Sequence, residues 1–141
     1  MSGSQAFLSF VNYLQDALSG SGVTVNIKKG DTLTPPYLNM QAGPEEIISH
    51  WLSSKLCQAW VVVEENPNEE PLVVTEERVM NLVIKATQDA GSLPKYDYEQ
   101  NPTVQTGLFT VHIEEITGDM SNEQKTSRRV ITWLLHSNSK R

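Results

Sequence analysis

The sequence Gln58-Ala59-Trp60-Val61-Val62-Val63-Glu64 stands near the middle of the chain. Because side chains alternate between the two faces of a β-strand, Ala59, Val61 and Val63 share one face. Trp60 and Val62 share the other face. Both faces carry apolar groups that must be covered, so this segment predicts a strand at the centre of a sheet.

Two segments with helical periodicity lie on either side of this strand along the chain. In the first, Ser4 is the predicted N-cap and Gly20 marks the end. In the second, Thr75 is the predicted N-cap, Glu76 lies favourably in the first turn, and Gly91 marks the end. The apolar faces of the two helices consist of Phe7, Phe10, Val11, Leu14 and Leu18, and of Val79, Leu82, Val83, Ala86 and Ala90.

Shorter alternating segments predict the remaining strands. Residues 23–28 and 37–41 form two of them, and residues 108–117 and 127–135 form a final hairpin with a polar tip at 118–126. Residues 92–106 carry two prolines, and we expect a long irregular connection there.

Residues 44–57 are compatible with two structures. Pro44 followed by two glutamates resembles the first turn of a helix. The same residues can form an irregular strand that continues into the central one. We favour the strand, because only a few residues separate this segment from Gln58.

Together these elements predict a single α+β domain over residues 1–141. The expected architecture is a two-layer sandwich, in which two helices cover one face of a mainly antiparallel sheet of about four to five strands.

Composition and charge exclude several classes of partner. The formal net charge is -6 and the basic clusters are only two residues long, whereas binding phosphates needs clustered cations. We therefore expect no sequence-specific nucleic acid contact. No run reaches the ~18 apolar residues of a membrane helix, and residues 1–5 do not resemble a signal peptide. The expectation is a soluble intracellular protein without a membrane partner.

The sequence contains no motif typical of catalysis, and we expect no enzymatic activity, cofactor or metal. His50, His112 and His136 lie on three separate predicted elements. His112 and Glu114 share one strand face, which an exposed polar surface explains. The single cysteine, Cys57, is expected to be a buried small apolar residue.

The second face of the sheet is the strongest functional indication. Two helices can cover only one face, yet Trp60, Val62, Val130 and Leu134 all belong to the opposite register. An exposed apolar patch of this kind usually marks an interface. We therefore predict that these four residues contact another subunit, unless residues 44–57 fold over them.

The order of elements adds a resemblance. The segments that carry it are Pro36-Tyr37-Leu38-Asn39-Met40, Gln58-Ala59-Trp60-Val61-Val62-Val63-Glu64 and Arg128-Arg129-Val130-Ile131-Thr132-Trp133-Leu134, together with Tyr96-Asp97-Tyr98. In this order and over nearly its whole length, the chain resembles the tail terminator (tail completion) proteins of long-tailed bacteriophages. The resemblance implies a homo-oligomeric ring of six subunits at the head-proximal end of the tail tube. Such a ring ends tube polymerisation and joins the tail to the head.

The implied partners are the tail tube protein and the head-tail connector protein, and the implied location is the virion tail, with host cytoplasm during assembly. Two polar loops are the candidate contact sites, because recognition groups tend to lie on loops. Their charged residues are Glu64, Glu65, Glu69 and Glu70 in the first loop and Asp119, Glu123 and Lys125 in the second.

Two alternatives remain open. The chain could be a head-completion, neck or minor tail protein, which is again a virion component. It could also be a small regulatory or ligand-binding α/β domain that uses the second sheet face as a pocket. A ring in solution favours the virion component, and a monomer that binds a small molecule favours the pocket.

Overall fold

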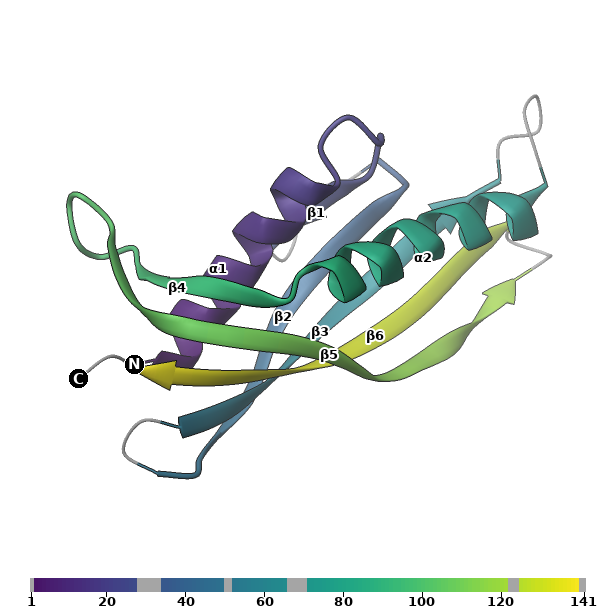
Figure 1. Cartoon of the computed structure of the whole chain (residues 1–141). Helices are drawn as coiled ribbons and strands as arrows, with labels where there is room; N and C mark the ends of the chain where they lie inside the picture. Colours follow the sequence, from purple (N-terminus) through teal and green to yellow (C-terminus); the bar gives the residue numbers. More distant parts are fainter. Residues whose placement is uncertain (1, 28–33, 50–51, 66–70, 122–124, 140–141) are drawn as a thin grey trace.

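The computed structural model describes residues 2–27, 34–49, 52–65, 71–121 and 125–139. The fold is α+β, with two helices and a six-stranded, mixed sheet that curls strongly into a half-barrel (Figure 1). Along the chain the elements are α1 (Ser2–Ala17), β1 (Thr24–Asn26), β2 (Tyr37–Ile47), β3 (Leu52–Glu64), α2 (Leu72–Asp89), β4 (Ser92–Asp97), β5 (Val104–Ser121) and β6 (Thr126–Ser139).

The strands lie in the order β1-β2-β3-β6-β5-β4. Only β1 and β2 pair in parallel, and the other neighbours are antiparallel. The register shifts between Ala42 and Glu45 in β2 and between Ile113 and Glu115 in β5. Such bulges bend a strand and increase its twist, so they contribute to the curl of the sheet.

The prediction of four to five strands was wrong, because the sheet has six strands and β4 was not predicted. Residues 92–106 are not an irregular connection, because residues 92–97 pair with residues 104–110 of β5. Pro94 is tolerated there because β4 is an edge strand, where a residue without an N–H group can face away from its only neighbour.

Both helices begin earlier than the predicted caps. Ser4 and Thr75 lie inside α1 and α2, and the residue before the first turn of α2 is Pro71. The hydroxyl of Thr75 points back to the carbonyl oxygen of Pro71 at 3.4 Å instead of capping an N–H group. The extra turn of α2 forms because Leu72 is apolar and becomes buried against the core.

The core lies between the helices and the concave face of the sheet. Phe10 and Leu14 of α1 and Val79 and Val83 of α2 are fully buried there. The rings of Phe10 and Trp133 are nearly perpendicular, with their centroids 5.1 Å apart. The prediction that the helices cover the face of β3 that carries Ala59, Val61 and Val63 is confirmed, because all three residues are buried in this core.

The strand interpretation of residues 44–57 is confirmed for the described part of this segment. Glu46 pairs with Ser54 and Ile47 with Ser53, so β2 and β3 form one long hairpin. The segment is therefore part of the sheet and does not fold over the face opposite the helices (Figure 1).

Candidate assembly surfaces

The face of the sheet opposite the helices, here called the open face, holds the four predicted interface residues. Trp60 lies directly opposite Val130 in the pairing of β3 with β6, and Leu134 lies opposite Leu56. Trp60 is 47% exposed, whereas Val130 and Leu134 are half-buried. The alternation of the sequence therefore placed these residues on a common face correctly.

Val62 differs from the expectation of an exposed apolar group. It is buried, although it lies outside the main core. Its neighbours in the pairing are Tyr37 on β2 and Arg128 on β6, whose long side chains can lie over a small branched one. Among the four predicted residues, the exposed apolar surface is consequently smaller than expected, and Trp60 supplies most of it.

Polar and apolar groups share the rest of the open face, where Leu52 and Leu108 flank Asn138 and are 44% and 42% exposed. The side chain of Gln58 donates a hydrogen bond to the hydroxyl of Thr132 at 3.3 Å. This pair separates the Trp60–Val130 pair from Leu134 along the strands. This mixture of apolar and polar side chains differs from the composition of a core and is shared by protein interfaces and ordinary surface.

Two histidines meet on the open face, although the sequence placed them on separate elements. His112 of β5 and His136 of β6 stack with ring centroids 5.3 Å apart. The predicted proximity of His112 and Glu114 is confirmed, since a ring nitrogen of His112 lies 2.7 Å from the carboxylate of Glu114. Among the described residues, no three His, Cys, Asp or Glu side chains are arranged to hold a metal ion.

The two candidate contact loops begin at the same end of the molecule. Glu64 pairs with Thr126, and the backbone N–H of Glu65 donates to the carbonyl oxygen of Lys125 at 2.9 Å. Asp119 lies in β5, opposite Arg128 of β6. The side chains of Glu64 and Lys125 are exposed. Glu69, Glu70 and Glu123 lie outside the described residues.

Behind these loops is a buried polar network that the sequence did not indicate. Glu76 of α2 accepts a hydrogen bond from the hydroxyl of Ser127 at 2.7 Å. Its other carboxylate oxygen accepts from Nε and Nη2 of Arg129 at 2.8 and 2.7 Å. Nη1 of Arg129 also donates to the carbonyl oxygen of Gly118 at 3.0 Å. The network therefore joins the start of α2 to the β5–β6 hairpin.

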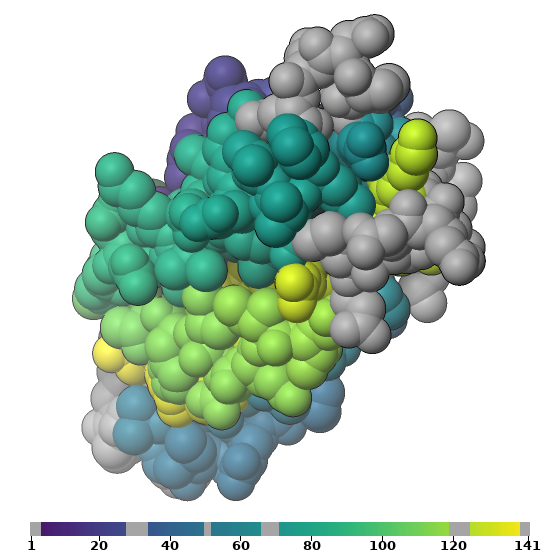
Figure 2. Space-filling model, turned by 90° about the vertical axis from the view of Figure 1, so that its right-hand side faces the viewer, coloured from purple at the N-terminus to yellow at the C-terminus, as the bar shows by residue number. Residues whose placement is uncertain are grey.

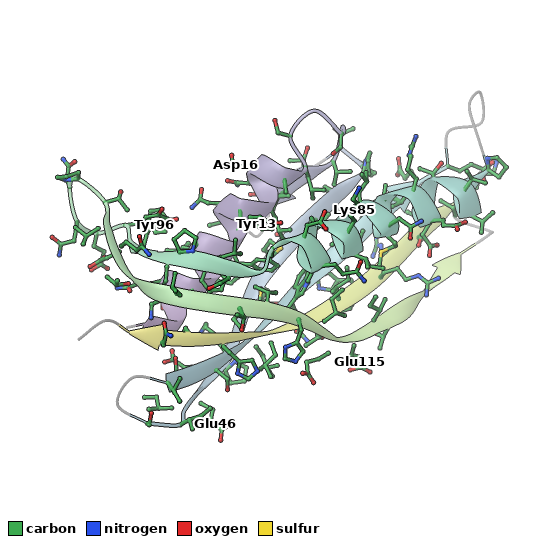
Figure 3. The ribbon with its side chains drawn as sticks, viewed as in Figure 1. Tyr13, Asp16, Glu46, Lys85, Tyr96 and Glu115 are labelled. Carbon is green, nitrogen blue, oxygen red and sulfur yellow. The ribbon has the colours of Figure 1, made fainter. Side chains whose placement is uncertain are left out.

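A tyrosine-lined groove of about 230 Å³ separates α1 from β4. The hydroxyl of Tyr13 donates to the carbonyl oxygen of Ala86 at 2.6 Å, and the backbone N–H of Tyr96 donates to the hydroxyl of Ser9. Burial, and then the charge of Asp89, raise the pKa of Tyr13. Tyr13, Asp16 and Tyr96 are labelled in Figure 3, which shows them on these two elements.

Two buried groups have shifted pKa values. Burial raises the pKa of the Cys57 thiol to about 12, so this thiol is neutral at physiological pH. The prediction that Cys57 is a buried apolar residue is confirmed. Burial lowers the pKa of Lys95, and the nearby charge of Glu45 partly offsets this effect. The ammonium group of Lys95 donates to the carbonyl oxygen of Asn138 at 2.9 Å.

Neither described helix has the length and apolar character that crossing a bilayer requires. No protein-family model matches the chain, and no curated protein matches it at a significant level.

Proposed function

We propose that this protein is a structural component of a bacteriophage tail. In this proposal six copies form a ring at the head-proximal end of the tail tube, which ends tube polymerisation and provides the surface for joining to the head. The protein acts in the virion tail after assembly in the host cytoplasm. Its partners are other copies of itself, the tail tube protein and the head-tail connector protein.

The observation that carries the proposal is the open face. Both helices pack on the concave side of the sheet, and Trp60 with its partner Val130 lies on the other side, which neither described helix covers. Large apolar groups on such a face favour contact with another protein chain. The resemblance in the order of elements to tail terminators supports a ring as the form of that contact.

The two contact loops begin at the same end of the molecule, which supports the proposed contact with the tail tube or the connector. Glu64 and Lys125 lie at one end of the molecule, so in a ring their charges repeat around one rim. Repetition turns a modest contact into a multivalent one. In the proposal this rim meets the tail tube or the connector through Glu64, Glu65, Glu69, Glu70, Asp119, Glu123 and Lys125.

Negative-stain imaging and light scattering of the purified protein, alone and mixed with tail tubes, test this function. The wild type is expected to form rings or to cap tube ends. Trp60→Asp should remove the assembly, because it places a charge in a buried contact. Val104→Asp is the matched control, since Val104 is 48% exposed and lies at the start of β5. A folded wild type that neither forms rings nor binds tubes contradicts the proposal.

The same experiment separates the alternatives. A ring that binds connectors and not tubes indicates a head-completion or neck protein, and binding along the tube indicates a minor tail protein. A ligand-binding domain is less well supported. The hollows at the open face measure about 250 Å³ beside Trp60 and about 300 Å³ beside Leu108 and His136, at or below the lower end of the ~300 to 1,000 Å³ that is usual for small-molecule sites.

A further inference from the structure

The tyrosine-lined groove between α1 and β4 has no role in the proposed ring. One wall is a stripe of α1 residues spaced three or four apart, and the other is β4 with the residue that follows it. The lining residues are Ser9, Asn12, Tyr13, Asp16, Leu93, Pro94, Tyr96 and Tyr98. The volume of about 230 Å³ is below the ~300 to 1,000 Å³ of most small-molecule sites. A single long side chain is therefore a better match to the size of the groove than a whole small molecule.

Contacts with the rest of the fold hold the groove in shape. The ring of Tyr13 stacks on that of Phe10, with centroids 6.4 Å apart, and its hydroxyl donates to the carbonyl oxygen of Ala86 at 2.6 Å. The backbone N–H of Tyr96 donates to the hydroxyl of Ser9 at 3.0 Å, which joins the two walls. A site that is ordered before binding loses less entropy when its ligand arrives.

Three tyrosine rings line the groove. Tyr96 and Tyr98 lie with their ring centroids 6.1 Å apart and their planes inclined at 59°. Tyr13 and Tyr96 are half-buried, and Tyr98 is 39% exposed. The face of an aromatic ring carries negative partial charge and attracts a cation placed above it. Several rings around one groove therefore favour a cation over an anion.

Carboxylates give the groove the same preference. Asp16 lines the groove, and Asp97 and Glu99 flank Tyr98 along the chain. Asp89 is also near, because its charge adds to the effect of burial in raising the pKa of Tyr13. None of the described residues that line the groove is a cation.

The lysines on the neighbouring elements are placed elsewhere. Lys95 of β4 is buried, and its ammonium group donates to the carbonyl oxygen of Asn138 on β6. Lys85 lines a hollow on the outer side of α2. The groove therefore combines aromatic faces with negative charge, which is complementary to a positively charged group on a partner.

Arginine matches both features of the groove, because its planar guanidinium group stacks on aromatic rings and donates to carboxylates. We infer that the groove binds an arginine side chain from a basic segment of a partner protein. The aliphatic part of this side chain packs beside Tyr96 and Tyr98. The guanidinium group meets Tyr13 and Asp16, which are neighbours three residues apart on α1 (Figure 3).

An NMR titration of the isotope-labelled protein with a capped Gly-Gly-Arg-Gly-Gly peptide tests the inference. The backbone amide of Tyr96 is the reporter, because its hydrogen bond to Ser9 joins both walls. We expect saturable shifts of this signal in the millimolar range. The same peptide with citrulline, which has the shape of arginine without its charge, should bind at least about fivefold more weakly. An arginine peptide that causes no saturable shifts at the groove, or a citrulline peptide that binds equally well, overturns the inference.

The change Asp16→Asn provides a second test. It should weaken binding of the arginine peptide by about two- to fivefold and leave binding of the citrulline peptide unchanged, because only arginine pairs with the carboxylate. Asp16 is exposed, so the fold should be retained, which circular dichroism checks.

The matched control is Glu77→Gln, which removes an exposed carboxylate from α2. Figure 2 shows α2 (teal) on the visible face and α1 (purple) only at its edge, so this control changes a surface away from the groove. Equal effects of Asp16→Asn and Glu77→Gln would mean that the peptide responds only to the net charge of the protein. That result also overturns the inference.

Three other results would each replace arginine as the occupant. Shifts of the Tyr96 signal with rising protein concentration, in the absence of peptide, would assign the groove to a second copy of this chain. Tighter binding of tetramethylammonium than of the arginine peptide would assign it to a quaternary ammonium ligand. Tighter binding of a triproline peptide would assign it to a proline-rich segment.

The inference and the proposed function can fail separately. Binding of the arginine peptide by a protein that neither forms rings nor binds tubes contradicts the tail function and leaves the groove assignment intact. Rings that cap tails, from a protein that does not bind the peptide, contradict the groove assignment and leave the tail function intact.

Discussion

The network at Glu76 gives the sharpest prediction about stability. Its carboxylate is buried and accepts hydrogen bonds from Ser127 and Arg129. Glu76→Ala removes all of these at once and leaves the hydroxyl of Ser127, a residue with 0% exposure, without this partner. An unsatisfied buried hydroxyl costs about 1 to 3 kcal/mol. Arg129 keeps its bond to Gly118.

The loss of the ion pair between Glu76 and Arg129 adds less to the destabilisation than it would if both side chains were fully buried. Breaking a fully buried pair costs about 3 to 5 kcal/mol because one charge stays buried and unpaired. The side chain of Arg129 is 31% exposed, so water can solvate and screen its charge after the change. We therefore expect Glu76→Ala to lower the free energy of unfolding by about 3 kcal/mol.

Glu76→Gln separates the charge from the hydrogen bonds. The amide oxygen can still accept from Arg129, and the amide N–H can donate to the hydroxyl of Ser127, which also accepts. The charge assistance is lost and the hydroxyl proton of Ser127 loses this acceptor, but a hydrogen bond to each partner remains, so the expected cost is about 1 to 2 kcal/mol.

Urea denaturation monitored by tryptophan fluorescence measures both variants, and the slope with denaturant should stay unchanged. Glu77→Ala is the matched control, because Glu77 is exposed on the same helix and should cost under about 0.5 kcal/mol. The reasoning is refuted if Glu76→Ala is no more destabilising than Glu77→Ala. It is also refuted if Glu76→Gln costs as much as Glu76→Ala.

Three further predictions concern single groups and the acidic loop. The Cys57 thiol, whose pKa is about 12, should react with a thiol reagent near neutral pH only when the protein unfolds, whereas a Val104→Cys reporter in a Cys57→Ala background should react at once. Burial lowers the pKa of Lys95 in the folded protein. At pH values between the folded and the unfolded pKa, the Lys95 side chain is therefore protonated in the unfolded chain and neutral in the folded one. The free energy of unfolding should consequently increase with pH as the pH approaches 10.5, the ordinary pKa of lysine. Lys95→Met should remove that contribution, and urea midpoints at about pH 8 and about pH 10 that shift equally in both proteins would contradict the assignment. The combined change of the loop glutamates to glutamine should keep folding and oligomer size and reduce tail capping or head joining, and normal activity at every salt concentration would show that the loop is only a solvated surface. The residues changed in that variant are Glu64, Glu65, Glu69 and Glu70.

Local periodicity explains what the sequence predicted well. Strict alternation over residues 58–64 assigned each side chain of the central strand to the correct face, since a strand has a period of two residues. The helical spacing of Phe10 and Leu14, and of Val79 and Val83, likewise identified the buried faces of α1 and α2. These assignments need no knowledge of the tertiary fold.

The errors arise where a distant neighbour decides the structure. Pro94 argues against a strand locally, but pairing with β5 on one side only makes a strand possible. Glu76 has the signature of a residue that favours the helix dipole, yet it is buried by Ser127 and Arg129 from a strand about fifty residues later. One signal was available: Ser127 and Arg129 share the inward register of β6, where a partly buried cation favours an acidic partner.

The expectation that Val62 is exposed was wrong for a related reason. Alternation fixes the face on which Val62 lies, but the neighbours that cover it belong to β2 and β6. The exposure of Ile47 and Ile48 depends in turn on how far the β2–β3 hairpin projects, which the sequence of the hairpin does not encode by itself. The local sequence thus determines on which face of the sheet a side chain lies, whereas its exposure depends on the neighbouring strands.

The mixed composition of the open face suits a subunit that must remain dispersed before it assembles. Gln58 and Thr132 satisfy each other's hydrogen bonds, and His112 is paired with Glu114, so the monomer exposes these groups to water at little cost. A continuous apolar face would associate as soon as the chain folded. In the ring that we propose, Trp60 contributes a limited apolar contact, and this contact repeats around the closed assembly. A template such as a finished tube end would then raise the local concentration of subunits enough to complete the ring, and assembly would be confined to that place.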